Sequence, residues 1–207
     1  MNHLGEHLMI LYGRGQLGLD EDEGLLRRFL AESHPDIRRH AIGFVGRSLK
    51  GEEQIPEEVV GRFKTLWDTY WAGTGKQDVQ QKPDAWLFGT WFSSGQFPAR
   101  WALEQLESFV DVTPTPEPDH AIVEQLTKIA QADIGKAIRI LDRMIRGDRE
   151  GWRIHGWLAS ARQILAVAMM AGGNARTQAE QVINYLGRRG HIEFGELLNL
   201  RGTTNSV

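Results

Sequence analysis

The sequence predicts an all-α protein, organised as a stack of antiparallel helical hairpins. Apolar residues recur at three- and four-residue steps through most of the chain, which is the pattern of amphipathic helices. No sustained alternation of apolar and polar residues predicts a strand. Short turn-like segments separate the stripes, so we expect roughly ten helices joined mostly by short turns, in a single domain over residues 1–207.

The apolar stripes place the expected helices in order along the chain. Leu4, Leu8 and Leu11 form the first stripe, and it starts so near residue 1 that we expect the chain to be a fragment of a longer protein; the alternative is an ordinary frayed terminal helix. The segment WLFGTWF (86–92) is apolar nearly all round, as in a helix buried between neighbours. The other stripes run over 37–49, 59–71, 122–130, 134–145, 154–169 and 179–186.

Residues at the edges of these stripes predict where helices begin and end. Pro35 and Pro56 suit the first turn of a helix, where a missing N–H costs no hydrogen bond. Asp20 with Glu23, and Thr177 with Glu180, have the spacing of a capping box. Gly172-Gly173 predicts the end of a long helix.

Two longer connections are expected. Residues 72–84 are polar and contain glycine, and residues 111–119 carry three prolines that prevent a continuous helix.

Part of the sequence resembles known helical-repeat families. Pro35, Asp36, Ile37, Arg38 and Ala41 resemble the turn and second helix of a HEAT repeat, which implies a HEAT/ARM-like stack. Longer segments resemble the C-terminal helical region of large bacterial multidomain proteins with a STAND-type NTPase core. This resemblance implies a fragment without the nucleotide site, and it transfers no catalytic residue. Those segments are HLGEHLMILYGRGQL, WLFGTWFSSGQFPARWALEQL, GDREGWRIHGWLASARQILAVAM and INYLGRRGHIEF.

Composition narrows the classes of partner. The net charge is −3, so no overall field attracts the chain to nucleic acid or to anionic membranes. The chain has no cysteine, which excludes disulfides and zinc–thiolate sites and fits a reducing compartment. We find no signal peptide and no apolar run long enough to cross a bilayer. We therefore expect a cytoplasmic protein with no membrane partner.

Two short motifs match known patterns, one for dinucleotide binding and one for zinc proteases. Neither lies in the structural context that such a site requires. Residues 13–18 read G-x-G-x-x-G, but acidic residues follow at 20–23 where a pyrophosphate would sit, and no βαβ unit is predicted. We interpret LMILY (8–12) as the end of a helix and the glycines as a turn. His3, Glu6 and His7 match H-x-x-E-H, a zinc-protease pattern, on a segment that Gly5 weakens as a helix. We expect no catalytic residue, cofactor, metal or small-molecule ligand.

The segment GDREGWRIHGW (147–157) gives the one candidate binding site. Arg149, Trp152, Arg153 and His155 interleave cationic and aromatic side chains, which is typical of anchor residues in protein interfaces. The structural alternative is that Trp152 packs at a helix start while the arginines lie in water. We predict partner binding through these four residues.

The predicted function is a non-enzymatic helical-repeat scaffold for protein–protein or intramolecular contacts, as the sensor or C-terminal region of a larger NTPase. The alternative is a DNA-binding HEAT-like protein of the alkylpurine DNA glycosylase type, for which Arg139, Arg143 and Arg146 would supply a stripe that tracks phosphates. Nearby acids such as Asp142 and Asp148 argue for a paired surface instead. A spacer or oligomerisation element is a third possibility.

Overall fold

The computed structural model describes residues 3–21, 24–50, 54–72 and 85–200, without the side chains of residues 71, 72 and 85. These segments are helical and contain no strand, which confirms the predicted all-α class. None of their helices is both long and apolar enough to cross a bilayer. The chain divides into two compact units, Met1–Phe97 and Pro98–Val207. Each is described separately, and the expectation of a single domain over 1–207 stays a prediction.

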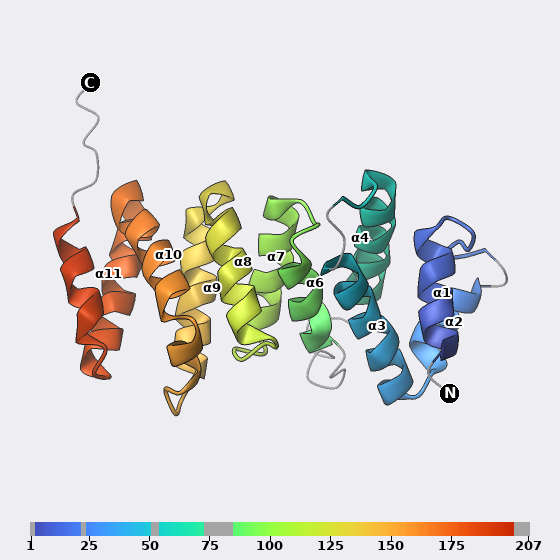
Figure 1. The fold of residues 1–207 in the computed structure, drawn as a ribbon, viewed down its shortest axis with the longest axis horizontal. Helices are drawn as coiled ribbons and strands as arrows, with labels where there is room; N and C mark the ends of the chain where they lie inside the picture. The colour runs from blue at the N-terminus through green and yellow to red at the C-terminus, as the bar shows by residue number, and fades with distance from the viewer. Residues whose placement is uncertain (1–2, 22–23, 51–53, 73–84, 201–207) are drawn as a thin grey trace, which may run out of the picture. The chain divides into compact units, whose positions relative to one another are not determined.

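Unit 1 is organised around its third helix, α3, which contacts α1, α6 and the short helix η2, while α4 contacts α1 (Figure 1). Its elements are α1 (His3–Gly13), α2 (Leu25–Glu32), α3 (Pro35–Lys50), α4 (Glu57–Ala72), η2 (Ala85–Leu87) and α6 (Phe88–Ser94).

The first helix buries a different face from the one predicted. Of the predicted stripe only Leu8 is buried; Leu4 and Leu11 are exposed, and Met9 and Tyr12 are buried with Leu8. The predicted stripe consisted of leucines alone. The buried face also contains Gly5, Met9 and Tyr12, each of which lies about one third of a turn around the helix from the leucine before it.

The turn after α1 confirms the interpretation of the glycine-rich motif. LMILY lies in α1, the helix ends at Gly13, and Gly15 has a positive φ of 73° in the turn. Arg62 of α4 holds this turn, since its Nε donates to the Tyr12 carbonyl at 2.6 Å and its Nη2 to the Leu17 carbonyl at 2.7 Å. The motif therefore follows a helix and not a strand.

In unit 2, each helix from α7 to α9 contacts the helix two places further along the chain, and α10 also contacts its neighbours α9 and α11. The contacting pairs include α7 with α9, α8 with α10, α9 with α11, and α10 with α11. The bounds are α7 (Ala99–Val110), α8 (Asp119–Ile129), η3 (Ala130–Ala132), α9 (Ile134–Gly147), η4 (Arg153–Gly156), α10 (Leu158–Ala171), α11 (Gly173–Arg188) and η5 (Ile192–Asn199).

Several helix ends differ from the sequence-based expectation. The stripe at 154–169 is not one helix, because Trp157 leaves the helical region (φ −141°) between η4 and α10. Gly172 does end α10, with a positive φ of 74°. The Thr177–Glu180 capping box is wrong, since α11 already begins at Gly173, directly after the glycine turn. Glu23 of the other proposed box lies outside the described residues.

The proline-rich connection between α7 and α8 spans residues 111–118. The predicted connection at 72–84 lies, after residue 72, outside the described residues.

Four of the six tryptophans whose side chains the structure describes are buried. Trp67 and Trp91 are buried in unit 1, and Trp101 and Trp157 in unit 2. Trp86 is half-buried with the Arg39 guanidinium 5.9 Å from its ring centre, and the side chain of Trp71 is not described. Among the tryptophan side chains that the structure describes, Trp152 is the one that is exposed.

Candidate functional site

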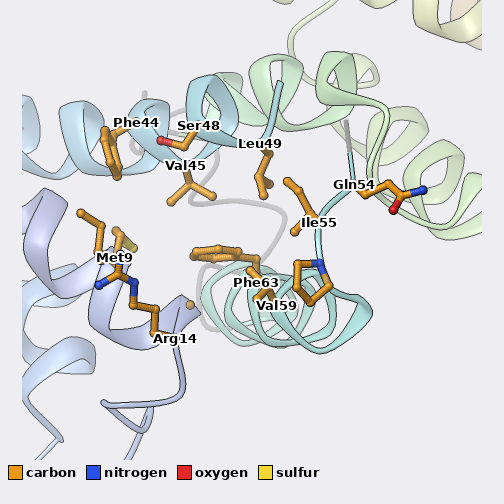
Figure 2. A pocket seen from close by; sticks show the side chains of 13 residues that line it. Met9, Arg14, Phe44, Val45, Ser48, Leu49, Gln54, Ile55, Val59 and Phe63 are labelled. Atoms are coloured by element: carbon orange, nitrogen blue, oxygen red, sulfur yellow. The ribbon is translucent and has the colours of Figure 1, made fainter. Parts of the chain in front are cut away.

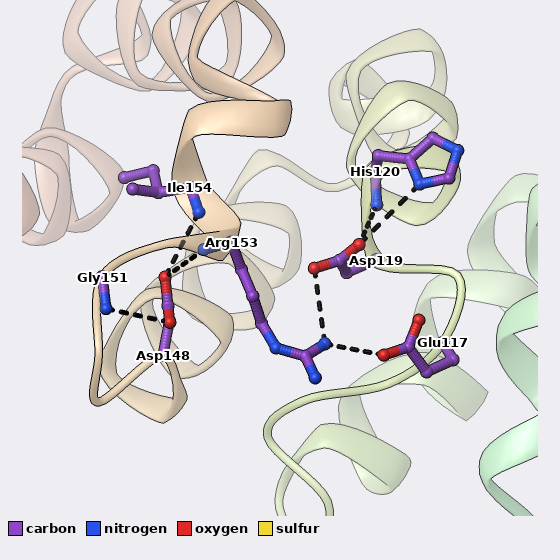
Figure 3. A network of polar contacts seen from close by, with 7 residues as sticks. All are labelled: Glu117, Asp119, His120, Asp148, Gly151, Arg153 and Ile154. Carbon is purple, nitrogen blue, oxygen red and sulfur yellow. Dashed lines mark hydrogen bonds and ion pairs between the residues drawn. The ribbon is translucent and has the colours of Figure 1, made fainter.

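The connection between α9 and α10 is organised by one buried carboxylate. Asp148 is only 5% exposed, and its side chain accepts hydrogen bonds from the backbone N–H groups of Gly151 (3.0 Å), Arg153 (2.9 Å) and Ile154 (3.2 Å) (Figure 3). Gly151 has a positive φ of 78°, which suits glycine. Three donors converging on one carboxylate hold the backbone from Asp148 to Ile154 in a single conformation.

A second tie connects the same segment to the end of α11. The Arg189 guanidinium donates to the carbonyls of Asp148 (3.1 Å) and Arg149 (2.8 Å). It also lies 5.9 Å from the ring centre of Tyr185. The connection is therefore fixed both from within and from a neighbouring helix.

Arg153, one of the predicted binding residues, is used within the protein. Its Nη1 donates to Glu117 at 2.8 Å and contacts Asp119 at 3.4 Å (Figure 3). The hydrogen bond to Glu117 raises the pKa of the guanidinium, opposed by partial desolvation. Arg153 thus ties the connection to the start of α8, and its charge is already answered by two carboxylates.

Trp152 and His155 project from this fixed backbone. Trp152 is 74% exposed, and its ring centre lies 6.3 Å from that of His155, which is also exposed. The His155 ring lies 5.4 Å from His191, and the next residue, Ile192, is 79% exposed. We call Trp152, His155 and Ile192 the Trp152 patch.

Arg149, the fourth predicted residue, lines a cleft of about 390 Å³ beside the proline-rich connection. Arg143 and Arg146 also line it, but they pair with Asp111 and with Asp142, respectively. Among the described residues, the exposed Arg149 side chain has no hydrogen-bond or ion-pair partner. It is the arginine of this cleft that remains available to an external anion.

The structure thus brings the four predicted residues into one connection but gives them different roles. The role of Asp148 as an organiser was not predicted, although an aspartate followed by glycine three positions later is a turn signal. The approach of His191, after the end of α11, to within 5.4 Å of the His155 ring was not predicted either. No local pattern in the sequence connects residues 155 and 191.

The candidate phosphate-binding stripe on α9 is largely paired with α7. Arg139 contacts Glu107 at 2.5 Å, and Arg143 pairs with Asp111 and lies 3.8 Å from Glu107. The hydrogen bond to Glu107 raises the pKa of Arg139. These residues form an interhelical ion-pair ladder, and their charges are not displayed together as an open cationic track.

The H-x-x-E-H segment also forms internal contacts. Glu6 accepts a hydrogen bond from His40 Nε2 of α3 at 2.6 Å, and its other oxygen lies 3.4 Å from His3. The bond from His40 lowers the pKa of Glu6, with desolvation opposing it. His7 is exposed. Within the described segments, His, Asp and Glu do not gather in threes that could hold a metal ion.

Comparisons with models of protein families, with curated proteins and with solved structures return no match to this chain. The resemblances to HEAT repeats and to the C-terminal region of STAND-type proteins therefore stay predictions. In the HEAT-like segment, Arg38 is buried and donates to the carbonyl of Ser33 at 3.0 Å, close to its own helix start.

Proposed function

We propose that the chain is a non-enzymatic helical-repeat scaffold that binds another protein, or another part of a longer chain, through the Trp152 patch. The observation that carries this proposal is the exposure of Trp152 on a backbone held by Asp148 and Arg189. Tryptophan and arginine dominate binding energy in protein interfaces. A binding segment that is already ordered loses less conformational entropy when its partner arrives.

The charges near the patch indicate the chemistry of the partner. Arg149 is exposed and without an internal partner among the described residues, and it borders the cleft of about 390 Å³. Trp152 in the same connection, and Ile192 after α11, expose apolar side chains. We therefore expect a partner segment with an apolar side chain flanked by aspartate or glutamate.

The helical contacts support the scaffold part of the proposal. In unit 2 each helix from α7 to α9 contacts the helix two places further along, as expected when hairpins stack. This pattern suits a HEAT-like repeat in the sensor or C-terminal region of a larger NTPase. A cytoplasmic location remains an expectation from the sequence.

The proposal can be tested with a displayed library of random twelve-residue peptides selected against the whole chain. We expect selected peptides to carry an apolar residue next to acidic ones. Trp152→Ala should weaken their binding by at least about tenfold, as for an interface anchor. It should change the free energy of unfolding by less than about 0.5 kcal/mol, because the side chain is exposed.

The matched control is Met170→Ala, which removes another exposed apolar side chain, 50% exposed on α10 and outside the patch. Its peptide binding should equal that of the unmodified protein. Selection of no peptide, or equal binding to Trp152→Ala, contradicts the proposal. A large loss of stability in Trp152→Ala would assign the side chain a structural role instead.

The DNA-binding alternative is less well supported by the geometry, because Arg139 and Arg143 pair with carboxylates of α7. A gel shift at low salt with damaged and undamaged duplex tests it directly. Binding that falls steeply with salt would favour DNA, since each phosphate contact releases counterions.

A further inference from the structure

Unit 1 contains an apolar cavity of about 410 Å³ between α1, α3, α4 and the segment before α4. Met9 lies on one side and Ile55 on the opposite side, with Val45 and Leu49 of α3 facing Phe63 of α4 across the space (Figure 2). The pocket opens to solvent, since Ser48, Gln54 and Pro56 on its wall are exposed. Its volume lies in the range of small-molecule binding pockets, about 300–1,000 Å³.

Glycine shapes one wall of the cavity. A Cβ on Gly13 would lie 2.9 Å from Cζ of Phe63, so glycine allows the end of α1 to approach that ring closely. The centre of the Phe63 ring lies 6.0 Å from that of Tyr12 and 5.9 Å from that of Trp91. Phe63 is therefore held by neighbours and is not free to fill the space.

One cation lies at the rim. Arg14 lines the cavity and is exposed, whereas Arg62 nearby uses its donors to hold the turn after α1. Among the residues that the structure describes, the Arg14 side chain has no hydrogen-bond or ion-pair partner. Because Arg62 fixes the Tyr12 and Leu17 carbonyls, the intervening Arg14 is held at the mouth of an apolar space.

We propose that this cavity binds a small amphiphile, a medium-chain carboxylic acid, whose chain lies against Met9, Val45 and Phe63 and whose carboxylate pairs with Arg14. At about 30 Å³ for each water-sized group, the cavity has room for about 14 non-hydrogen atoms. Decanoate, with ten carbons and two oxygens, fits this limit. The proposal replaces the sequence-based expectation of no small-molecule ligand, and it is independent of the Trp152 patch.

Isothermal titration calorimetry of the whole chain tests the proposal with decanoate, its neutral analogue 1-decanol, and hexadecanoate, each kept below its solubility or aggregation limit. We expect one decanoate site with a dissociation constant of about 10–100 μM, from the ligand efficiency of small ligands. Decanol should bind about tenfold more weakly because it lacks the charge. Hexadecanoate should also bind more weakly, because its chain exceeds the cavity.

Two variants separate the charge from the cavity. Arg14→Gln should reduce decanoate affinity about tenfold, to that of decanol, and leave decanol binding unchanged. Ser48→Phe places a ring at the exposed Ser48 on the cavity wall and should abolish binding of both. Arg47→Gln is the matched control, since it removes an exposed cation of α3 that does not line the cavity.

Circular dichroism verifies that each variant is folded, and the smaller Ser48→Leu serves if Ser48→Phe is not. The proposal is overturned by the absence of saturable decanoate binding up to about 1 mM, which corresponds to less than about 4 kcal/mol of binding free energy. Equal decanoate binding to the unmodified protein and to Arg14→Gln or the Ser48 variant also overturns it. Equal affinity for decanoate and decanol does the same.

Discussion

The two units hold their helices together by different means. Unit 1 relies on an aromatic cluster around Trp91. The centre of the Trp91 ring lies 5.2 Å from that of Trp67, 5.9 Å from that of Phe63 and 5.7 Å from that of Phe97, on which it stacks in parallel. The core of unit 2 around α8 to α10 is mainly aliphatic, and α7 and α9 are joined by ion pairs. The apolar pocket of about 410 Å³ lies in unit 1, where Phe63 of the aromatic cluster forms part of its wall.

The two units also differ in their candidate binding surfaces. Unit 1 has an open apolar pocket with a cation at its rim, whereas unit 2 exposes a tryptophan on a connection held by polar bonds. The comparison predicts that unit 1 is most sensitive to loss of rings and unit 2 to loss of buried polar anchors.

The largest expected effect is in the aromatic cluster. Trp91→Ala should reduce the free energy of unfolding by about 3–5 kcal/mol, because it leaves a cavity where three rings pack. It also removes the hydrogen bond that the indole N–H donates to the Ile42 carbonyl at 2.8 Å. Urea denaturation followed by circular dichroism measures the loss.

Leu141→Ala is the counterpart in unit 2, where Leu141 is fully buried. We expect the free energy of unfolding to fall by about 2–4 kcal/mol, because leucine leaves a smaller cavity than tryptophan and its removal breaks no hydrogen bond. Should Leu141→Ala prove the more damaging of the two, the aromatic cluster would not be the stronger core and the comparison would fail.

The second effect concerns the buried polar anchor of unit 2. Asp148→Ala should cost about 2–3 kcal/mol, because three backbone N–H groups lose a charged acceptor. The amides of Gly151, Arg153 and Ile154 should exchange hydrogen faster in the variant. Asp148→Asn keeps one side-chain oxygen and should lose about half as much. Unchanged exchange at these amides would show that Asp148 does not hold the connection.

The third effect is in the ladder between α7 and α9. Glu107→Gln should cost about 0.5–1 kcal/mol, because Glu107 is mostly buried while Arg139 and Arg143 are more than one-third exposed and partly screened. The loss should shrink in 1 M salt. Glu124→Gln is the control, since the Glu124–Lys128 pair is 62% exposed on both sides and should contribute less than about 0.5 kcal/mol. Equal losses in the two variants would contradict a special role for the ladder.

This ladder also illustrates what the sequence could and could not predict. Apolar periodicity predicted the helices well, because burial of one face repeats locally at every turn. It predicted that Ile138, Leu141 and Ile164 are buried, as they are. The partners of Arg139 and Arg143 lie about thirty residues upstream on α7, whereas the sequence analysis looked for them within the same helix. Pairing between helices depends on their packing, which no single-helix pattern contains.

The candidate site was predicted in part for the same reason. Trp152 stood out because no apolar stripe included it, and its exposure agrees with that exclusion. The role of Arg153 could not be predicted, since Glu117 and Asp119 reach it from another connection. The cavity beside Arg14 likewise depends on how three helices meet, and the glycine motif signalled only the turn.

The smallest expected effect is a pH dependence in unit 1, where Glu6 and His40 join α1 to α3. The hydrogen bond from His40 holds the pKa of Glu6 below its ordinary value of 4.5. The unfolded chain therefore takes up a proton at Glu6 at a higher pH than the folded protein does. The stabilisation is complete above the ordinary pKa and declines as the pH falls from about 5 through the lower folded pKa.

Denaturation of the unmodified protein and of Glu6→Gln from pH 6.5 to pH 3 isolates this contribution from the other carboxylates. Their difference in free energy of unfolding should be constant near pH 6 and should shrink toward acid pH. The His3→Ala variant should keep most of the pH dependence of stability that Glu6 contributes. The contact of Glu6 with His3 is the longer one, at 3.4 Å, and His40 has the larger influence on the pKa of Glu6. A difference that grows on acidification would mean that the pKa of Glu6 is raised in the folded state, and the contact with His40 would then not stabilise its charged form.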